Sequence, residues 1–343
     1  MPETHEPGAY LKATLQSQPR ELSRLLADDS APIAAARLRD CSRIFVVGTG
    51  TSYHGALAGQ FMLRSAGIDA WAVRAFEFAG YPPALRQGDG LVLLSHRGSK
   101  QFSRQSLDLF DQSGMPWVAI TGEGSAIEGA ADEGFVRTVE QEKSPVHTAS
   151  HTAAMLRLAQ IAAALGKPSW RAQLADLPDA VATALDWRNK VAEDVRRIEL
   201  KPVVHFVGGG PARASAYEGA LKLREACHLV SAEGHDADGI LHGPLVSIQP
   251  GQTVVAIAEP GPSLRRTREV IRALGEIGAT VIEVGSATDG YKTTRFDEVL
   301  APIVNVVPLQ MLAYEASIRL GVDADSFRRD EPPYAAAQAG FTL

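Results

Sequence analysis

Short apolar runs alternate with longer helical patterns along most of the chain. The stretch 43–52 reads as an apolar strand that enters a glycine-rich turn, and a helical pattern follows from Tyr53. Further strands are expected at 90–95, 114–121 and 135–139, before a long helix at 150–165. Such alternation is typical of a parallel sheet with helices on both faces, so it predicts an α/β fold.

The same plan returns in the second half of the chain. The stretch 203–214 again joins an apolar strand to a glycine-rich turn, and a helical pattern follows from Ala216. The later elements of this half are expected as strands at 253–258, 278–284 and 299–307 and a closing helix at 308–320. Self-similarity at this distance indicates an internal duplication of a doubly wound parallel-sheet subdomain.

Domain boundaries follow from the duplication. We expect a leading helical arm, a first domain, a charged helical linker, and a second domain that ends in a C-terminal tail. These segments span 1–29, 30–166, 167–201 and 202–343.

Bulk composition narrows the class of protein. The 343 residues, 45% hydrophobic and 22% charged, have room for about two soluble domains. A net charge of −6 argues against a surface for nucleic acid or acidic membranes. The start of the chain has no signal-peptide pattern, and no apolar run approaches the roughly 20 residues that span a bilayer. Cys41 and Cys227 are too few for a disulfide framework and too far apart for a metal cluster, so we expect a cytoplasmic protein without metal or cofactor.

Two turns rich in glycine and hydroxyl groups are candidates for binding an anion. The first, 48–52, opens a helix whose free N–H groups and positive dipole end favour a phosphate. The dinucleotide spacing G-x-G-x-x-G is not met, because Tyr53 stands at the third glycine position. The alternative interpretation is a tight turn whose hydroxyls cap the helix.

The second turn, 95–100, follows directly after an expected buried strand. It combines hydroxyls and a glycine with three side chains that can carry positive charge, His96, Arg97 and Lys100. Such a loop suits an anion, although it could also be a solvated loop before a helix. Two such turns at strand ends of the same half favour one shared anion site.

A third pattern places charges on one helical face. Glu218, Lys222 and Glu225 stand at i, i+4 and i+7. The segment opens at a glycine-rich strand end, and a carboxylate beside a lysine can serve there as a tuned base near the start of a helix. An exposed face with salt bridges is the alternative.

His242 precedes a Gly-Pro pair that forces a turn. A loop histidine can move protons near neutral pH, although a lone histidine is often structural or merely solvated. His235 and Asp236 lie nearby as possible second participants. The sequence contains no HExxH, GxSxG, Walker A or CxxC pattern, so it gives no support to a zinc protease, an α/β-hydrolase or a P-loop protein.

These motifs, in this order, resemble the tandem SIS-domain (sugar isomerase) family over about residues 30–330. This family includes the isomerase half of glucosamine-6-phosphate synthases and the fructoselysine-6-phosphate deglycases. The most specific matching segments are 50–54, 218–225, 242–245 and 301–314. The resemblance implies two SIS-type, flavodoxin-like subdomains and a phosphosugar substrate.

The resemblance also implies roles for individual residues. Glu225 falls where the family keeps the base that moves a proton between C1 and C2, and Lys222 sits beside it. His242 falls where a histidine from the other subunit of a dimer opens the sugar ring. The residues implied around the sugar and its phosphate are Gly50, Thr51, Ser52, Ser95, His96, Arg97, Ser99, Lys100, Val146 and Thr148.

Several positions depart from the family pattern. No glutaminase domain precedes the first SIS-type domain, so this chain alone is not expected to draw ammonia from glutamine. Pro332 or a neighbour stands where the synthases carry a tail lysine, so imine chemistry through that lysine is not expected. The loop 95–100 reads Ser-His-Arg-Gly-Ser-Lys where the family reads Ser-Gln-Ser-Gly-Glu-Thr, and Gly239 replaces an acidic residue before His242.

Three functions remain open on the sequence. The chain could be an enzyme that isomerises a phosphosugar or cleaves its C–N bond. It could be a non-catalytic sugar-phosphate sensor, or a structural oligomer with a vestigial site. The first half keeps the anion loops while 258–263 lacks them, and the second half keeps Glu225 and His242. We therefore expect one composite site, completed across a homodimer.

Overall fold

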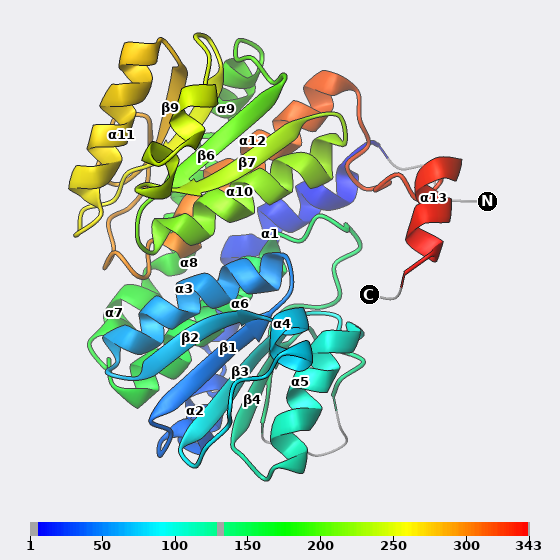
Figure 1. Cartoon of the computed structure of the whole chain (residues 1–343), viewed down its shortest axis with the longest axis vertical. Helices are drawn as coiled ribbons and strands as arrows, with labels where there is room; N and C mark the ends of the chain where they lie inside the picture. Colours follow the sequence, from blue (N-terminus) through cyan, green and yellow to red (C-terminus); the bar gives the residue numbers. More distant parts are fainter. Residues whose placement is uncertain (1–5, 129–133, 342–343) are drawn as a thin grey trace. The chain divides into compact units, whose positions relative to one another are not determined.

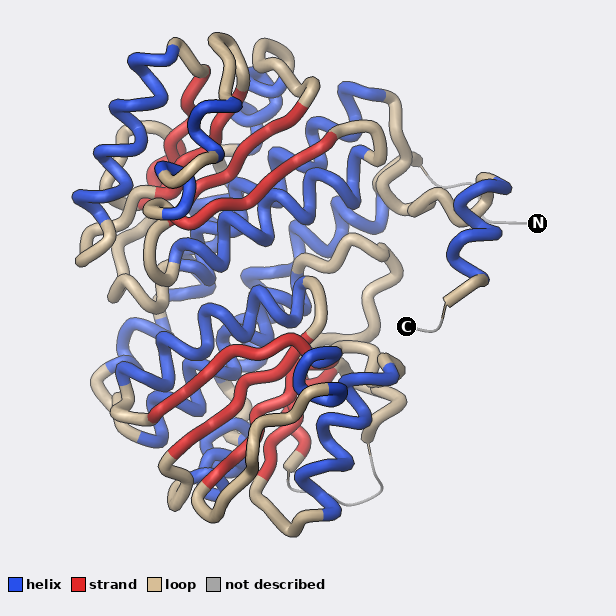
Figure 2. Tube along the Cα trace, in the orientation of Figure 1, coloured by secondary structure: helices blue, strands red, loops and turns tan. Residues whose placement is uncertain are grey.

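The computed structural model describes residues 6–128 and 134–341, which form two compact units. The N-terminal unit consists of Gln18–Glu142, Ala149–Pro178 and Pro332–Leu343. The C-terminal unit consists of Met1–Ser17, Lys143–Thr148 and Asp179–Glu331. Each unit has its own five-stranded sheet (Figure 2).

The sheet of the N-terminal unit has the order β2-β1-β3-β4-β5, and every strand pair is parallel. Its strands are β1 (Arg43–Gly48), β2 (Asp69–Arg74), β3 (Asp89–Ser95), β4 (Trp117–Thr121) and β5 (Phe135–Arg137). The helices around it are α2 (Ser30–Ala35), α3 (Thr51–Ser65), α4 (Ala75–Gly80), α5 (Gln101–Gln112), α6 (Ala149–Leu165) and α7 (Trp170–Ala175). This strand order is that of flavodoxin-like folds.

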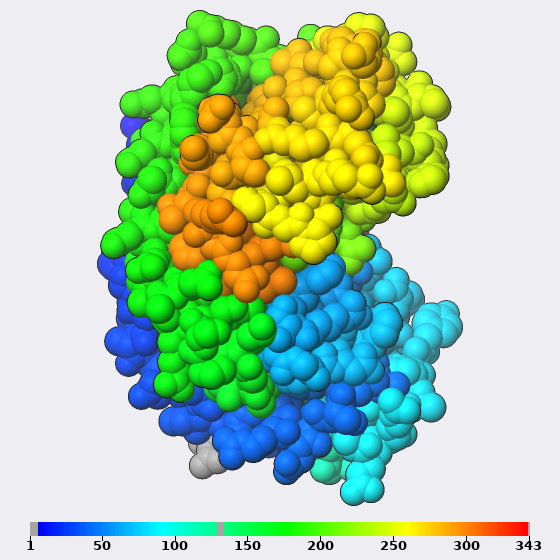
Figure 3. Space-filling model, turned by 90° about the vertical axis from the view of Figure 1, so that its left-hand side faces the viewer, coloured from blue at the N-terminus to red at the C-terminus, as the bar shows by residue number. Residues whose placement is uncertain are grey.

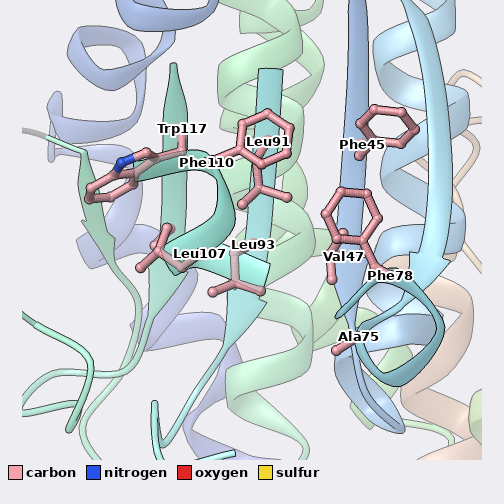
Figure 4. Close-up of a cluster of buried hydrophobic side chains, with 10 residues drawn as sticks. Phe45, Val47, Ala75, Phe78, Leu91, Leu93, Leu107, Phe110 and Trp117 are labelled. Atoms are coloured by element: carbon pink, nitrogen blue, oxygen red, sulfur yellow. The ribbon is translucent and has the colours of Figure 1, made fainter. Parts of the chain in front are cut away.

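Alternation along the strands explains the two layers of helices. Leu91 and Leu93 of β3 point to one face, where they meet Phe78 of α4 and Phe110 of α5 in a buried cluster (Figure 4). Leu94 points to the other face, where a Cβ at Gly55 of α3 would lie 3.1 Å from it. Both faces of the sheet are therefore buried, as the uninterrupted apolar runs predicted.

The C-terminal unit repeats this topology. Its sheet has the order β10-β9-β8-β6-β7. Read from the opposite edge, this order is β7-β6-β8-β9-β10, which matches β2-β1-β3-β4-β5 strand for strand. The strands are β6 (Val203–Gly208), β7 (Ser231–Asp236), β8 (Thr253–Ile257), β9 (Thr280–Gly285) and β10 (Tyr291–Lys292). The expected duplication of a doubly wound parallel sheet is confirmed.

Helices cover both faces of this second sheet as well. One face carries α10 (Ala212–Cys227) and α12 (Pro302–Leu320), and the other carries α11 (Leu264–Ile277) (Figure 1). Gly219 lets α10 approach closely, because a Cβ there would lie 2.8 Å from Phe206 and 3.0 Å from Leu309. The outer side of α11 reaches the surface in the yellow and orange region of Figure 3.

The remaining helices lie outside these layers. They are α1 (Ala9–Leu26), α8 (Leu177–Leu185), α9 (Arg188–Val195) and α13 (Pro332–Ala339). The stretch predicted as a helical linker contains α7, α8 and α9. Among the described residues, no helix combines the length and apolar character that crossing a membrane requires.

The predicted strand at 299–307 is wrong. Residues from Pro302 belong to α12, which continues through Pro308, and the fifth strand is the two-residue β10. Every residue from Pro302 to Tyr314 is buried. A helix buried on all sides has a continuous apolar sequence, so its pattern could not be distinguished from that of a buried strand followed by a proline break.

Candidate functional site

The two candidate anion loops, the turns 48–52 and 95–100, lie at the switch point of the N-terminal sheet. The chain leaves β1 towards β2 on one side and leaves β3 towards β4 on the other. The carboxyl ends of β1 and β3 therefore form the switch point at which doubly wound sheets bind their ligands. Val47 pairs with Leu93 in the register of these two strands. The turns after Gly48 and Ser95 therefore start beside each other, as expected for a shared site.

Close backbone approach explains the glycines of the first turn. A Cβ at Gly48 would lie 2.5 Å from the carbonyl carbon of Ser52, and Gly50 has φ = 56°. Thr51 and Ser52 form the first turn of α3, and both are half-buried. Their hydroxyls thus stand beside the N–H groups with which a helix N-terminus binds an anion.

The second turn is held in place by the backbone. The N–H groups of Gly122 and Ala126 donate to the carbonyl oxygens of His96 and Arg97, at 2.9 Å and 3.0 Å. Gly98 has φ = 67°, and a Cβ there would lie 2.2 Å from the hydroxyl of Ser125. A fixed loop of this kind can present its polar groups to a ligand without reorganising.

The side chains of this loop take different positions. Ser95 ends β3 and is buried, Ser99 is exposed, and Arg97 and Lys100 are half-buried. His96 turns towards the scaffold, where its Nε2 accepts the N–H of Glu142 at 3.3 Å. Arg97 and Lys100 are the two other side chains of this loop that carry positive charge.

Val146 and Thr148, implied as sugar-lining residues, belong to the C-terminal unit and are fully buried. The hydroxyl of Thr148 donates to the hydroxyl of Thr14 at 2.9 Å. The structure therefore gives this hydroxyl a partner inside the protein.

The charged face of α10 is buried. Lys222 has a side chain with 0% exposure, and its Nζ donates to Glu225 Oε2 at 2.5 Å and lies 3.3 Å from Glu218 Oε1. Burial alone would lower the pKa of Lys222, but the two carboxylates outweigh burial and raise this pKa above its ordinary value. These contacts exclude the alternative of an exposed face with salt bridges.

Glu225 differs from Glu218 in its access to solvent. The side chain of Glu218 is fully buried, whereas that of Glu225 is 19% exposed. Lys222 donates a hydrogen bond to Oε2 of Glu225. Of the two carboxylates on this face, Glu225 is the one suited to proton transfer.

The expected position of Glu225 near the start of a helix is wrong. Glu225 lies in the last turn of α10, which ends at Cys227. The helix starts after the carboxyl end of β6 and returns along the sheet before β7, so its last turn lies near the amino ends of these parallel strands. The pattern located the helix face but not which end of the helix carries the base.

His242 lies between two short 3-10 helices, η2 (Gly239–Leu241) and η3 (Pro244–Ser247). Its side chain is 75% exposed, and its Nε2 lies 3.4 Å from an oxygen of Asp238. Asp238, one residue before Gly239, thus places a carboxylate beside this ring.

The switch point of the second sheet is filled by the protein itself. Ser263 donates its hydroxyl to Glu298 Oε1 at 2.6 Å. A Cβ at Gly261 would lie 2.1 Å from Glu298 Oε2, and one at Gly210 would lie 3.7 Å from Glu298 Oε1. A carboxylate of the chain therefore lies at this switch point, where a doubly wound sheet can bind an external anion.

The structure also brings together a group that the sequence did not predict. His205, Glu233 and His235 lie close enough for one atom of each to contact a single metal ion. The sequence predicted no metal site, and His205 and His235 lie on different strands. Only the pairing of β6 with β7 brings them into contact.

A comparison with protein families matches residues 37–165 to the model of the SIS domain. The first half of the chain carries a SIS domain. The matched stretch includes both anion loops of the N-terminal unit. Together with the repeated strand order, it supports two SIS-type subdomains.

Known proteins resemble the chain beyond this domain. It is 29% identical over 297 residues to the glutamine–fructose-6-phosphate aminotransferase (isomerizing) of Methanothermobacter thermautotrophicus, which covers 83% of this chain and 50% of that protein. The Pyrococcus horikoshii protein of the same name is 28% identical, over 94% of this chain and 57% of its own length. The chain thus spans about half the length of these relatives.

Solved structures share the whole fold. The C-terminal domain of the Francisella tularensis glucosamine-fructose-6-phosphate aminotransferase has a TM-score of 0.80 at 20% identity, covering 92% of this chain and 98% of that one. The Escherichia coli tagatose-6-phosphate ketose/aldose isomerase also has a TM-score of 0.80, at 19% identity, covering 94% and 98%. The chain therefore shares its whole fold with these two proteins.

Proposed function

We propose that this chain is an enzyme that moves a proton between adjacent carbons of a phosphorylated sugar. The net reaction is aldose–ketose isomerisation, or the related deamination or deglycation of a C–N bond. The observation that carries this proposal is the Lys222–Glu225 pair, in which a buried ammonium holds a carboxylate that still reaches solvent. A sensor needs an anion pocket but has no use for such a base.

The proposed roles follow from the chemistry of each group. Thr51, Ser52 and the cations of the loop 95–100 hold the phosphate. Glu225 takes the proton from the carbon beside the carbonyl, and the bond electrons form an enediolate. The hydroxyl proton passes from one oxygen to the other, and Glu225 returns the carbon-bound proton to the neighbouring carbon, so that the carbonyl forms at the other position. Lys222 fixes the position of the Glu225 carboxyl through the hydrogen bond that joins them. Both carbons of the substrate must lie within reach of this one carboxyl.

Ring opening needs a separate acid and base, and we assign it to His242. The high exposure of this side chain and the nearby Asp238 carboxylate support the role. We propose that His242 acts on a substrate held by a second copy of the chain, so that the active form is a homodimer. An exposed loop histidine is well placed to reach another molecule.

A panel of hexose, amino-sugar and glycated-amine phosphates tests the proposal, with isomerisation and the release of ammonia or amine measured together. We expect turnover of at least one member. Binding of several members without turnover of any would identify a sensor. Failure to bind any member would favour the third hypothesis, a structural oligomer with a vestigial site.

The anion loop can be tested by removing one charge at a time. We expect Arg97→Gln and Lys100→Gln each to raise KM by about tenfold or more while kcat changes little, because hydrogen bonds to charged groups contribute about 1.5–3 kcal/mol. Arg104→Gln, on the exposed side of α5, serves as the matched control and should leave KM within about twofold. An unchanged KM in both loop variants would show that the phosphate is held elsewhere.

A further inference from the structure

Three potential metal ligands share one face of the C-terminal sheet. His205 of β6 pairs in register with Glu233 of β7, and His235 follows two residues later on the same face of β7. These two strands lie side by side in Figure 1. Gly234 faces the opposite side, where a Cβ would lie 2.4 Å from Tyr217 of α10. The cluster is therefore separated by the sheet from the helix that carries Glu225.

The three ligand atoms have the spacing of a coordination sphere. His205 Nδ1 lies 3.1 Å from His235 Nε2, and Glu233 Oε2 lies 3.9 Å from the first and 3.7 Å from the second. The point equidistant from these three atoms lies about 2.1 Å from each, which is the length of zinc–nitrogen and zinc–carboxylate bonds. A cation fits there without movement of the backbone.

The two imidazoles of the cluster are buried. The side chains of His205 and His235 are 3% and 11% exposed, while that of Glu233 is 61% exposed and open to water. An imidazole binds a metal through one ring nitrogen, whose lone pair must be free of a proton. Among the described residues, the buried Nε2 of His205 has no hydrogen-bond partner, and it takes the ring proton when Nδ1 binds a metal.

We propose that His205, His235 and Glu233 bind one Zn²⁺ or a similar borderline transition-metal ion, with a fourth position open to water. Two imidazoles and one carboxylate suit this class of ion, whereas Mg²⁺ and Ca²⁺ prefer oxygen ligands. The site does not depend on the function proposed above.

The bound ion would tie the edge strand β7 to β6 just before the His242 loop. Asp236 ends β7, and its Oδ1 accepts the N–H groups of Asp238 at 3.1 Å and Gly239 at 2.7 Å. The first turn of η2, which leads to His242, is thus attached directly to the end of the strand that carries two of the ligands. A metal here would fix the position of that loop.

The test uses the full chain, stripped of metal with EDTA and then titrated with Zn²⁺ by calorimetry. We expect one Zn²⁺ per chain with a micromolar or lower Kd, no binding of Mg²⁺ at the same concentration, and a rise in Tm on addition of Zn²⁺. Glu233→Gln and His235→Gln should each weaken binding by at least about 100-fold and abolish the rise in Tm. Glu233 is exposed, so its variant is expected to fold normally.

His242→Gln is the matched control, because it removes an exposed histidine just outside the cluster. Its Kd for Zn²⁺ should stay within about twofold of that of the parent chain. The proposal is overturned if Zn²⁺ does not bind stoichiometrically, or if binding survives both Glu233→Gln and His235→Gln. Loss of binding in His242→Gln alone would place the ion at the loop and would also overturn it.

Discussion

Glu225→Gln is expected to lower kcat by about 10²- to 10⁴-fold while KM changes little, since the carboxamide keeps the shape of the side chain but cannot accept a proton as a base. The loss is measured on the best substrate of the phosphosugar panel. The folded state should survive, because Lys222 still has the carboxylate of Glu218 within 3.3 Å.

Glu218→Gln is the matched control for this prediction. Both carboxylates pair with Lys222, but Glu218 is fully buried and Glu225 is not. We expect Glu218→Gln to lose less than about tenfold in kcat, because it removes a neighbour of the base rather than the base itself. Equal losses in kcat would mean that both carboxylates act by holding the folded structure rather than by proton transfer. A Glu225→Gln variant with undiminished activity would show that Glu225 is not the base.

Lys222→Met is expected to lower the free energy of unfolding by about 3–5 kcal/mol, because it leaves two carboxylates beside a buried apolar side chain. Urea unfolding at pH 7 measures this change. A lysine whose folded-state pKa is raised adds stability that is fully present below the ordinary lysine pKa of about 10.4, and loses it only as pH rises through the higher folded value. The whole contribution is therefore present at pH 7.

The triple variant Glu218→Gln, Lys222→Met, Glu225→Gln separates lost charge pairing from lost packing. Without charges on this face, we expect it to regain about 1–4 kcal/mol over Lys222→Met. Turnover should stay absent, because the base is gone. A Lys222→Met variant as stable as the parent chain would contradict the buried ion-pair network.

The sequence predicted the fold well where local pattern and topology agree. Uninterrupted apolar runs gave β1, β3, β4 and β5 of the first sheet and β6, β8 and β9 of the second, but not β2, β7 or β10. The two glycine-rich turns were found at the ends of β1 and β6. The anion loops could be placed because parallel strands end on one edge of a sheet and ligands gather there. The face shared by Glu218, Lys222 and Glu225 followed from helical spacing alone.

The failures have physical causes. Period and composition cannot distinguish a helix buried on all sides from a strand, so α12 was misread at 299–307. The bounds of α10 put Glu225 in the last turn of this helix. The spacing of charged residues shows which helix face they share, but it does not show where the helix begins and ends. The cluster of His205 and His235 and the carboxylate of Glu298 depend on contacts between distant segments, which no local motif records.

Glu298 explains why the duplicated fold has unequal halves. It fills the second switch point from within. The candidate anion loops lie in the N-terminal unit, while Glu225 and His242, the residues proposed to transfer protons, lie in the C-terminal unit. The proposed function therefore needs both repeats.

Solvent hydrogen exchange tests the central claim most directly. The chain is incubated with each phosphosugar of the panel in D2O, and deuterium at the carbon beside the carbonyl is measured by NMR. We predict that at least one sugar phosphate gains deuterium with the parent chain and none does with Glu225→Gln, although both proteins bind the same ligand. Binding without deuterium incorporation in the parent chain, for every member of the panel, would contradict the account.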